Sequence, residues 1–201
     1  MTVRGVVFDV GNVLFTWDPR FLYERLIDDD RALDAFLRDV VTHDWHFQHD
    51  AGRPFAETSA ELIAEYPQHR ALIEAWGPRF NESLGPAVDG MIPLVEELDE
   101  AGVPLFAITN FSREFWGPFR DTQPVFGRFR DIVVSGAERL VKPGRAIYEL
   151  AVERFGIPAE ALVFIDDRAE NVAGAEAVGM RGHLFRDADT LRDELGTLGL
   201  L

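Results

Sequence analysis

The 201-residue sequence contains no cysteine. Disulfide bonds, thiol nucleophiles and thiolate metal ligands are therefore excluded for this chain. The sequence also lacks any apolar run close to the roughly 18 residues that span a bilayer. Its beginning, MTVRGVVFDV, has neither the long apolar stretch nor the small-residue cleavage site of a signal peptide. We expect a cytoplasmic protein that does not act at a membrane.

Basic residues are in the minority. Lys and Arg number 20 against 35 Asp and Glu, which gives a formal net charge of -15. The chain therefore lacks the basic face that non-specific nucleic-acid binding requires, and we expect no nucleic-acid partner. An anionic ligand would need a local source of positive charge, such as a metal ion, a lysine or a helix N-terminus.

Strands and helices are expected to alternate over most of the chain. The strands expected from continuous apolar runs are 3–8, 104–110, 130–136, 161–167 and 181–186. The helices expected between and after them are 90–103, 145–156, 169–179 and 187–199. From about 16 to 84 the spacing of apolar residues predicts helices alone, at 19–27, 30–41, 55–66 and 70–80.

This order predicts an α/β fold: a Rossmann-like open parallel sheet with an inserted α-helical domain. The core domain would comprise residues 1–15 and 85–201, and the insertion residues 16–84. In such sheets, ligands bind beyond the carboxyl ends of the strands.

Polar residues follow several of the expected strands. They are Asp9, Thr109, Asn110, Lys142, Asp166 and Asp167. Three aspartates converging in one crevice would repel one another, and a hard divalent cation such as Mg²⁺ would relieve that repulsion. The Thr109 hydroxyl, the Asn110 backbone N–H and the Lys142 ammonium group would then surround an anion such as phosphate. Asp9 could attack that phosphate in line and form an aspartyl-phosphate.

Each of these residues also has a structural interpretation. Asp167 and Glu170 fit a capping box that opens the next helix. Thr109, Asn110 or Ser112 could begin a turn or cap a helix, and Lys142-Pro143 could be a solvated turn. Asp9 could serve as a turn former before Gly11. An aspartate pair beside the apolar run VFI is nevertheless costly unless a cation is near.

Four stretches together resemble the motifs of the haloacid dehalogenase (HAD) superfamily. They are FDVGNVLF, FAITN, VKPGRAIYELAVERFGI and ALVFIDDRAENVAGAEAVGM, in the order and spacing of that family. The helical insertion resembles its C1-type cap. The DxGN form of the first motif, QHDAG, NFSREFW and the aspartate pair are similar to the bacterial α-D-glucose-1-phosphate phosphatase branch.

The resemblance implies a role for each matched residue in phosphate transfer. Asp9 would be the nucleophile, and Lys142 would orient both the nucleophile and the phosphate. Thr109 and Asn110 would contact the phosphate.

It also implies a Mg²⁺ site. Asp166 would bind the ion together with Asp9 and the Gly11 carbonyl. Asp167 and Asn171 would support the ion and its waters.

Gly11 departs from the family pattern. Most phosphatases of the superfamily carry an aspartate there, which protonates the leaving group and later activates water. We expect Gly11 to permit a tight turn, and we expect either a substrate with a good leaving group or another proton donor. Candidates for that proton donor are Asp18, His46 and His49.

We therefore expect a Mg²⁺-dependent phosphomonoester hydrolase that acts on a small phosphorylated metabolite, with a sugar phosphate as the first expectation. It would work as a monomer or homodimer. The alternatives are a 2-haloacid dehalogenase, which needs no metal, and a non-catalytic binding or regulatory protein that has lost turnover through Gly11.

Overall fold

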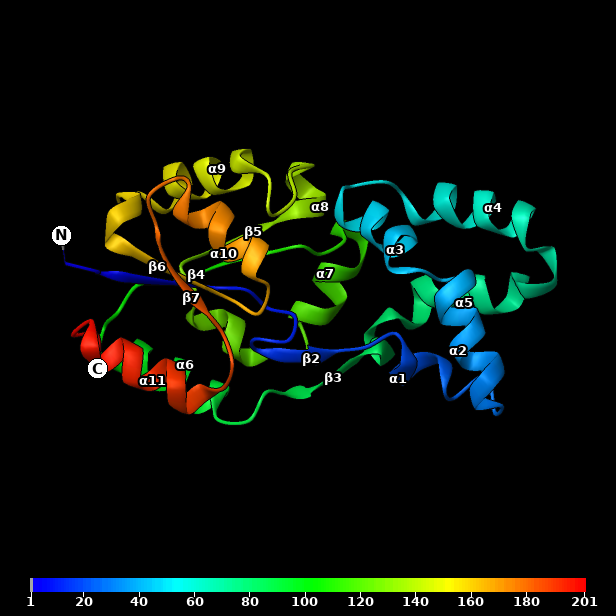
Figure 1. Cartoon of the computed structure of the whole chain (residues 1–201), viewed down its shortest axis with the longest axis horizontal. Coiled ribbons are helices and arrows are strands. Elements are labelled where there is room, and N and C mark those ends of the chain that lie inside the picture. Colours follow the sequence, from blue (N-terminus) through cyan, green and yellow to red (C-terminus); the bar gives the residue numbers. More distant parts are fainter. Residues whose placement is uncertain (1) are drawn as a thin grey trace.

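A five-stranded parallel sheet forms the centre of the computed structural model, which describes residues 2–201 (Figure 1). The strand order is β5-β4-β1-β6-β7. The strands are β1 (Gly5–Phe8), β4 (Leu105–Thr109), β5 (Asp131–Val134), β6 (Leu162–Asp166) and β7 (Arg181–Leu184). All five correspond to expected strands, so the predicted fold class is confirmed.

The central strands are buried on both faces, which explains their unbroken apolar sequences. In β1, Val6 and Phe8 join one hydrophobic layer, whereas Val7 joins the other. Val6 pairs with Leu105 of β4 on one side and with Val163 of β6 on the other. This register brings the carboxyl ends of β1, β4 and β6 together at one edge of the sheet.

Helices cover both faces of the sheet. The α-helices of this part are α6 (Met91–Glu100), α7 (Arg113–Arg120), α8 (Ser135–Glu138), α9 (Arg145–Phe155), α10 (Ala169–Glu176) and α11 (Ala188–Thr197). Two 3₁₀ helices accompany them, η3 (Pro124–Arg128) and η4 (Ala159–Ala161). In Figure 1, α9 and α10 lie on one side of the sheet and α6 and α11 on the other. Buried side chains of these pairs belong to separate layers, as the amphipathic patterning predicts.

The residues between β1 and α6 form a helical lobe at one end of the molecule (Figure 1). Its helices are α1 (Arg20–Tyr23), α2 (Asp30–Asp39), α3 (His43–Asp50), α4 (Phe55–Glu65), η1 (Pro67–His69), α5 (Arg70–Arg79) and η2 (Phe80–Ser83). Aromatic contacts hold them together; for example, the Tyr23 and Trp76 rings stack with centroids 5.8 Å apart. We call this lobe, residues 16–84, the insertion. Its division from the rest of the chain as a separate domain stays a prediction.

The expectation that 16–84 contains no strand is wrong. Strands β2 (Phe15–Trp17) and β3 (Leu84–Ala87) pair antiparallel where the chain enters and leaves the insertion. Their shortness and a register shift leave too few alternating positions for a recognisable pattern. The helix expected at 19–27 is also shorter than predicted: α1 ends at Tyr23, and the chain continues in turns.

Among residues 2–201, no helix is both long enough and apolar enough to cross a membrane.

Candidate active site

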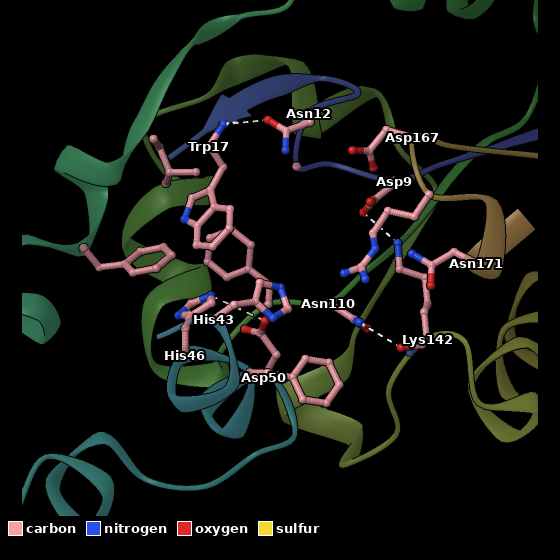
Figure 2. A pocket seen from close by; sticks show the side chains of 16 residues that line it. Asp9, Asn12, Trp17, His43, His46, Asp50, Asn110, Lys142, Asp167 and Asn171 are labelled. Carbon is pink, nitrogen blue, oxygen red and sulfur yellow. Dashed lines mark hydrogen bonds and ion pairs between the residues drawn. The ribbon is translucent and has the colours of Figure 1, made fainter. Parts of the chain in front are cut away.

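A cavity of about 470 Å³ lies between the carboxyl ends of the sheet strands and the insertion (Figure 2). Its lining residues on the sheet side include Asp9, Gly11, Asn110, Lys142, Asp167 and Asn171. Those from the insertion include Trp17, His43, His46, Phe47, Asp50 and Phe80. The cavity is therefore built from two parts of the chain that are distant in sequence.

The Lys142 side chain is buried, with 1% of its surface exposed. Its ammonium nitrogen lies 2.8 Å from Asp9 Oδ1 and 2.7 Å from Asp166 Oδ2. Burial alone would lower the pKa of Lys142, but the two carboxylates outweigh that effect and raise it. Lys142 is therefore a permanent cation between two buried carboxyl groups.

Asp166 ends β6 and is fully buried. The Asn171 amide donates to both of its oxygens, at 3.0 and 3.1 Å, and the Arg168 backbone N–H donates to Oδ1 at 2.9 Å. The capping-box interpretation of Asp167 and Glu170 is wrong, because Arg168 is the N-cap of α10 and its side chain makes no capping bond. Asp166 thus accepts a hydrogen bond from a backbone N–H at the start of α10 that has no partner within the helix.

Asp9 follows β1 directly and is 8% exposed. Its backbone N–H donates to the Ile165 carbonyl, and its Oδ1 accepts from the Val10 N–H at 2.7 Å. Burial raises the pKa of Asp9 to about 7; the Lys142 charge opposes this shift and the Asp166 charge adds to it. A second cation near Asp9 would favour the ionised form that a nucleophile needs.

Three carboxyl groups meet here. Oxygens of Asp9, Asp166 and Asp167 lie within 4.8 Å of one another. Burial, followed by the Asp166 charge, raises the pKa of Asp167. When all three are ionised, Lys142 balances one charge and leaves two. A divalent ion that prefers oxygen ligands, such as Mg²⁺, fits both this charge and this donor set.

Asn110 and Thr109 have different surroundings. The Asn110 amide donates to the Lys142 carbonyl at 3.0 Å, and its oxygen accepts from the Lys142 N–H at 2.9 Å. Asn110 thereby fixes the backbone that carries the lysine while it lines the cavity. Thr109 ends β4 and is buried, outside the set of lining residues. Ser112 caps α7, as one of the structural interpretations predicts, by accepting from the Glu114 N–H.

The turn after Asp9 does not depend on Gly11 in the expected way. The left-handed residue is Asn12, with φ of 56°, whereas Gly11 does not adopt a positive φ. Asn12 tolerates this conformation, and its side-chain oxygen accepts from the Trp17 N–H. A Cβ atom placed on Gly11 would meet no atom within 4 Å. The glycine therefore leaves space in the cavity and is not required by the backbone.

Rings from the insertion form the opposite wall. His46 stacks between Trp17 and Phe80, with centroid distances of 4.9 and 5.7 Å. Burial, followed by the neighbouring His49 charge, lowers the pKa of His46 well below its usual value. His46 is therefore a neutral ring in an aromatic wall.

Asp50 is the lining residue with an acidic side chain that the sequence did not single out. It is 5% exposed, and burial, followed by the Asp9 charge, raises its pKa well above the usual value. It lies in QHDAG, four residues after His46, in a segment otherwise rich in aromatic residues. The same helix also contains Asp44, so the sequence offered no signal that separated Asp50 from it. Asp18 and His49, which the sequence did suggest, are not among the residues lining the cavity.

Comparisons with known proteins agree with this architecture. The family model of haloacid dehalogenase-like hydrolases matches residues 3–179. A sesquiterpene phosphatase from Aspergillus oryzae is 26% identical over 193 residues, covering 93% of this chain and 92% of that protein.

Solved structures of HAD proteins share the fold. A HAD family enzyme from Bacteroides thetaiotaomicron, in complex with magnesium and inorganic phosphate, superimposes with a TM-score of 0.69 at 18% identity. The match covers 92% of this chain and 95% of that one. An L-2-haloacid dehalogenase superimposes with a TM-score of 0.65 at 24% identity over 90% of this chain and 86% of that one.

The family match spans four of the five sheet strands, the insertion and all three converging carboxylates. On that evidence, the chain belongs to the haloacid dehalogenase-like hydrolases.

Proposed function

We propose that the protein is a Mg²⁺-dependent phosphomonoester hydrolase with Asp9 as its nucleophile. The observation that carries this proposal is the buried Lys142 ammonium, bonded to both Asp9 and Asp166 beside a third carboxyl group, Asp167. A site that only held a halogenated acid would not need the second and third carboxylates.

Each residue then has a physical task. Asp9 attacks phosphorus in line and becomes the aspartyl-phosphate. Lys142 holds the Asp9 carboxylate in position and attracts the phosphate dianion, and the Asn110 side chain keeps the lysine's backbone in place. The Asn110 backbone N–H is the proposed phosphate contact, whereas Thr109, which the sequence also suggested, does not line the cavity.

Asp9, Asp166, Asp167 and the Gly11 carbonyl would hold the Mg²⁺ ion, and Asn171 would orient Asp166. A bound Mg²⁺ ion supplies positive charge that stabilises the phosphate oxygens as the ester bond breaks. The local excess of carboxylate charge supports this assignment.

Two classes of alcohol are candidates for the leaving group of the substrate. The sequence favours a sugar phosphate. The insertion wall of Trp17, Phe47 and Phe80 instead favours an apolar alcohol. The sesquiterpene phosphatase among the relatives supports this second candidate.

The test is phosphate release from 4-nitrophenyl phosphate, with Mg²⁺ and with EDTA. We expect turnover that requires the ion and that the Asp9→Asn variant lacks. Halide release from 2-chloropropionate without metal would instead indicate a dehalogenase, and no turnover on either compound would indicate a binding protein. A panel containing glucose 1-phosphate and farnesyl phosphate then separates the two substrate classes.

A further inference from the structure

The carboxyl group of Asp50 is buried and is not fully hydrogen-bonded. It is the last residue of α3 and enters the cavity from the insertion, whereas Asp9 and Asp167 enter from the sheet (Figure 2). Its Oδ1 atom is buried and has no hydrogen-bond partner, its Oδ2 lies 3.4 Å from His46 Nε2, and the Ser112 backbone N–H approaches the carboxyl group and partly opposes the rise of its pKa. A buried oxygen without a partner is costly, and because Asp50 lines the cavity, a ligand bound there could supply the missing hydrogen bond.

The backbone of Asp50 is fixed to the core of the protein. The Ser135 hydroxyl donates to the Asp50 carbonyl at 2.7 Å and accepts from the Phe111 N–H at 2.9 Å. Ser135 is fully buried. A Cβ atom on the adjacent Gly136 would lie 3.1 Å from the His49 carbonyl and closer still to two backbone atoms, so the two chain segments touch closely. Asp50 is therefore held in a constant position relative to the loop that carries Asn110.

The proposed hydrolase needs a proton donor that Gly11 cannot provide. Asp18 and His49 do not line the cavity, and His46, which does, is held neutral by burial. His43 also lines the cavity, but it is exposed and its ring stacks on Phe47. Asp167 is committed to the carboxylate cluster. Of the described residues that line the cavity and carry a carboxyl group, Asp50 lies outside that cluster.

We propose that Asp50 is the acid and base that replaces the aspartate missing at position 11. This inference rests on the proposed phosphomonoesterase activity. In the first step, Asp9 bonds to phosphorus, the bond from phosphorus to the alcohol oxygen breaks, and the Asp50 proton passes to that oxygen. In the second step, a water oxygen bonds to phosphorus, its proton passes to the Asp50 carboxylate, and the bond to Asp9 breaks. The products are the alcohol and inorganic phosphate, and both aspartates return to their initial states.

The surroundings of Asp50 suit this role. Burial raises its pKa, which favours the protonated form that a general acid needs before it gives its proton to an oxygen that develops negative charge. His46 Nε2 lies 3.4 Å from Asp50 Oδ2, so a small approach of the two groups would let a neutral His46 donate a hydrogen bond to the carboxylate that forms.

The test compares two esters with different leaving groups. A nitrophenoxide leaves without a proton, whereas a simple alkoxide needs one. In the Asp50→Asn variant, we expect kcat/KM for an alkyl phosphate to fall by about 10²-fold or more, the range of general acid catalysis. With 4-nitrophenyl phosphate the first step should change by less than about 5-fold, measured as the burst of nitrophenol in rapid mixing. Asp44→Asn makes the same chemical change on the exposed part of α3, and we expect it to leave both values unchanged.

A second variant separates acid catalysis from a structural effect. Because a Cβ at position 11 meets no neighbour, an aspartate can be introduced there. Gly11→Asp combined with Asp50→Asn should recover at least 10-fold of the lost alkyl-phosphate activity. Equal losses on both esters, or no recovery in the double variant, would overturn the inference.

The unaltered protein provides a further check if Asp50→Asn fails to fold. With Asp50 as donor, rates should depend weakly on leaving-group pKa across aryl and alkyl phosphates, and a steep dependence would refute the assignment. If the unaltered protein hydrolyses no phosphate ester, the proposed function itself fails. Hydrolysis that is unaffected by Asp50→Asn contradicts the role of Asp50 alone.

Discussion

Replacing Lys142 with methionine should lower the free energy of unfolding, and Mg²⁺ should restore much of the lost stability. Methionine keeps the length of the lysine stem and removes the charge. Within residues 2–201, Lys142 is the cation that pairs with Asp9 and Asp166, which are both buried. The substitution therefore leaves two carboxyl groups close together in a site that water reaches poorly.

The magnitude follows from this burial. Removing one partner of a buried ion pair costs about 3–5 kcal/mol, because the remaining charge is uncompensated. For a chain of this size, each kcal/mol lowers the midpoint of thermal unfolding by about 2–4 °C, so we expect a decrease of about 6–20 °C in EDTA. Mg²⁺ binds the folded state and should recover about 3 kcal/mol at 100 times its Kd.

The assay is thermal and urea unfolding in EDTA and in Mg²⁺, followed by circular dichroism. The matched control is Arg154→Met, because Arg154 also pairs with two carboxylates, Asp131 and Glu138, but on the surface. That control should cost less than about 1 kcal/mol and should not respond to Mg²⁺. If Lys142→Met costs no more than Arg154→Met in EDTA, or if Mg²⁺ stabilises Lys142→Met and the unaltered protein equally, the argument for charge compensation is refuted.

Three further predictions test other parts of the site. Asp9→Asn should abolish phosphate release and keep the circular dichroism spectrum, since the amide retains the volume and loses the nucleophile; normal turnover would exclude the aspartyl-phosphate. Asp166→Asn should raise the Mg²⁺ concentration needed for half-maximal activity by at least 10-fold, and an unchanged Mg²⁺ titration would remove Asp166 from the metal site. The third prediction is a pH dependence of stability that comes from His49. Burial, followed by the Arg53 charge, lowers the pKa of His49 to about 4 from 6.5, so the folded state binds fewer protons than the unfolded one. Stability should therefore be lost as pH falls from about 6.5 to 4, by about 3 kcal/mol from this residue, and His49→Gln should reduce that loss in urea titrations at each pH.

The sequence predicted the sheet because its central strands are buried on both faces. The runs that become β1, β4 and β6 are almost entirely apolar, which is typical of strands in a parallel sheet covered on both faces. By contrast, α3 was missed as a helix because its buried face carries His46, His49 and Asp50 beside Trp45. A search for apolar spacing does not detect a buried polar face.

The candidate site was predicted only where it depends on the sheet. Strand ends converge by topology, so Asp9, Asp166 and Lys142 could be grouped from their positions after expected strands. Asp50 could not be grouped with them, because its place is set by how α3 docks onto Ser135, 85 residues later in the chain. Contacts of that kind depend on side-chain packing between distant segments, and no local pattern encodes them.

Lys142 is the only lysine in the sequence, whereas arginine supplies the other 19 basic side chains. Selective isotope labelling of lysine would therefore produce a single side-chain signal in a nuclear magnetic resonance spectrum. That signal comes from the side chain whose ammonium group lies between Asp9 and Asp166, so its frequency reports on the charge state around the proposed nucleophile. With lysine isotope labelling as the only modification, this side chain is a spectroscopic probe of cation binding, of phosphate binding and of the proposed aspartyl-phosphate.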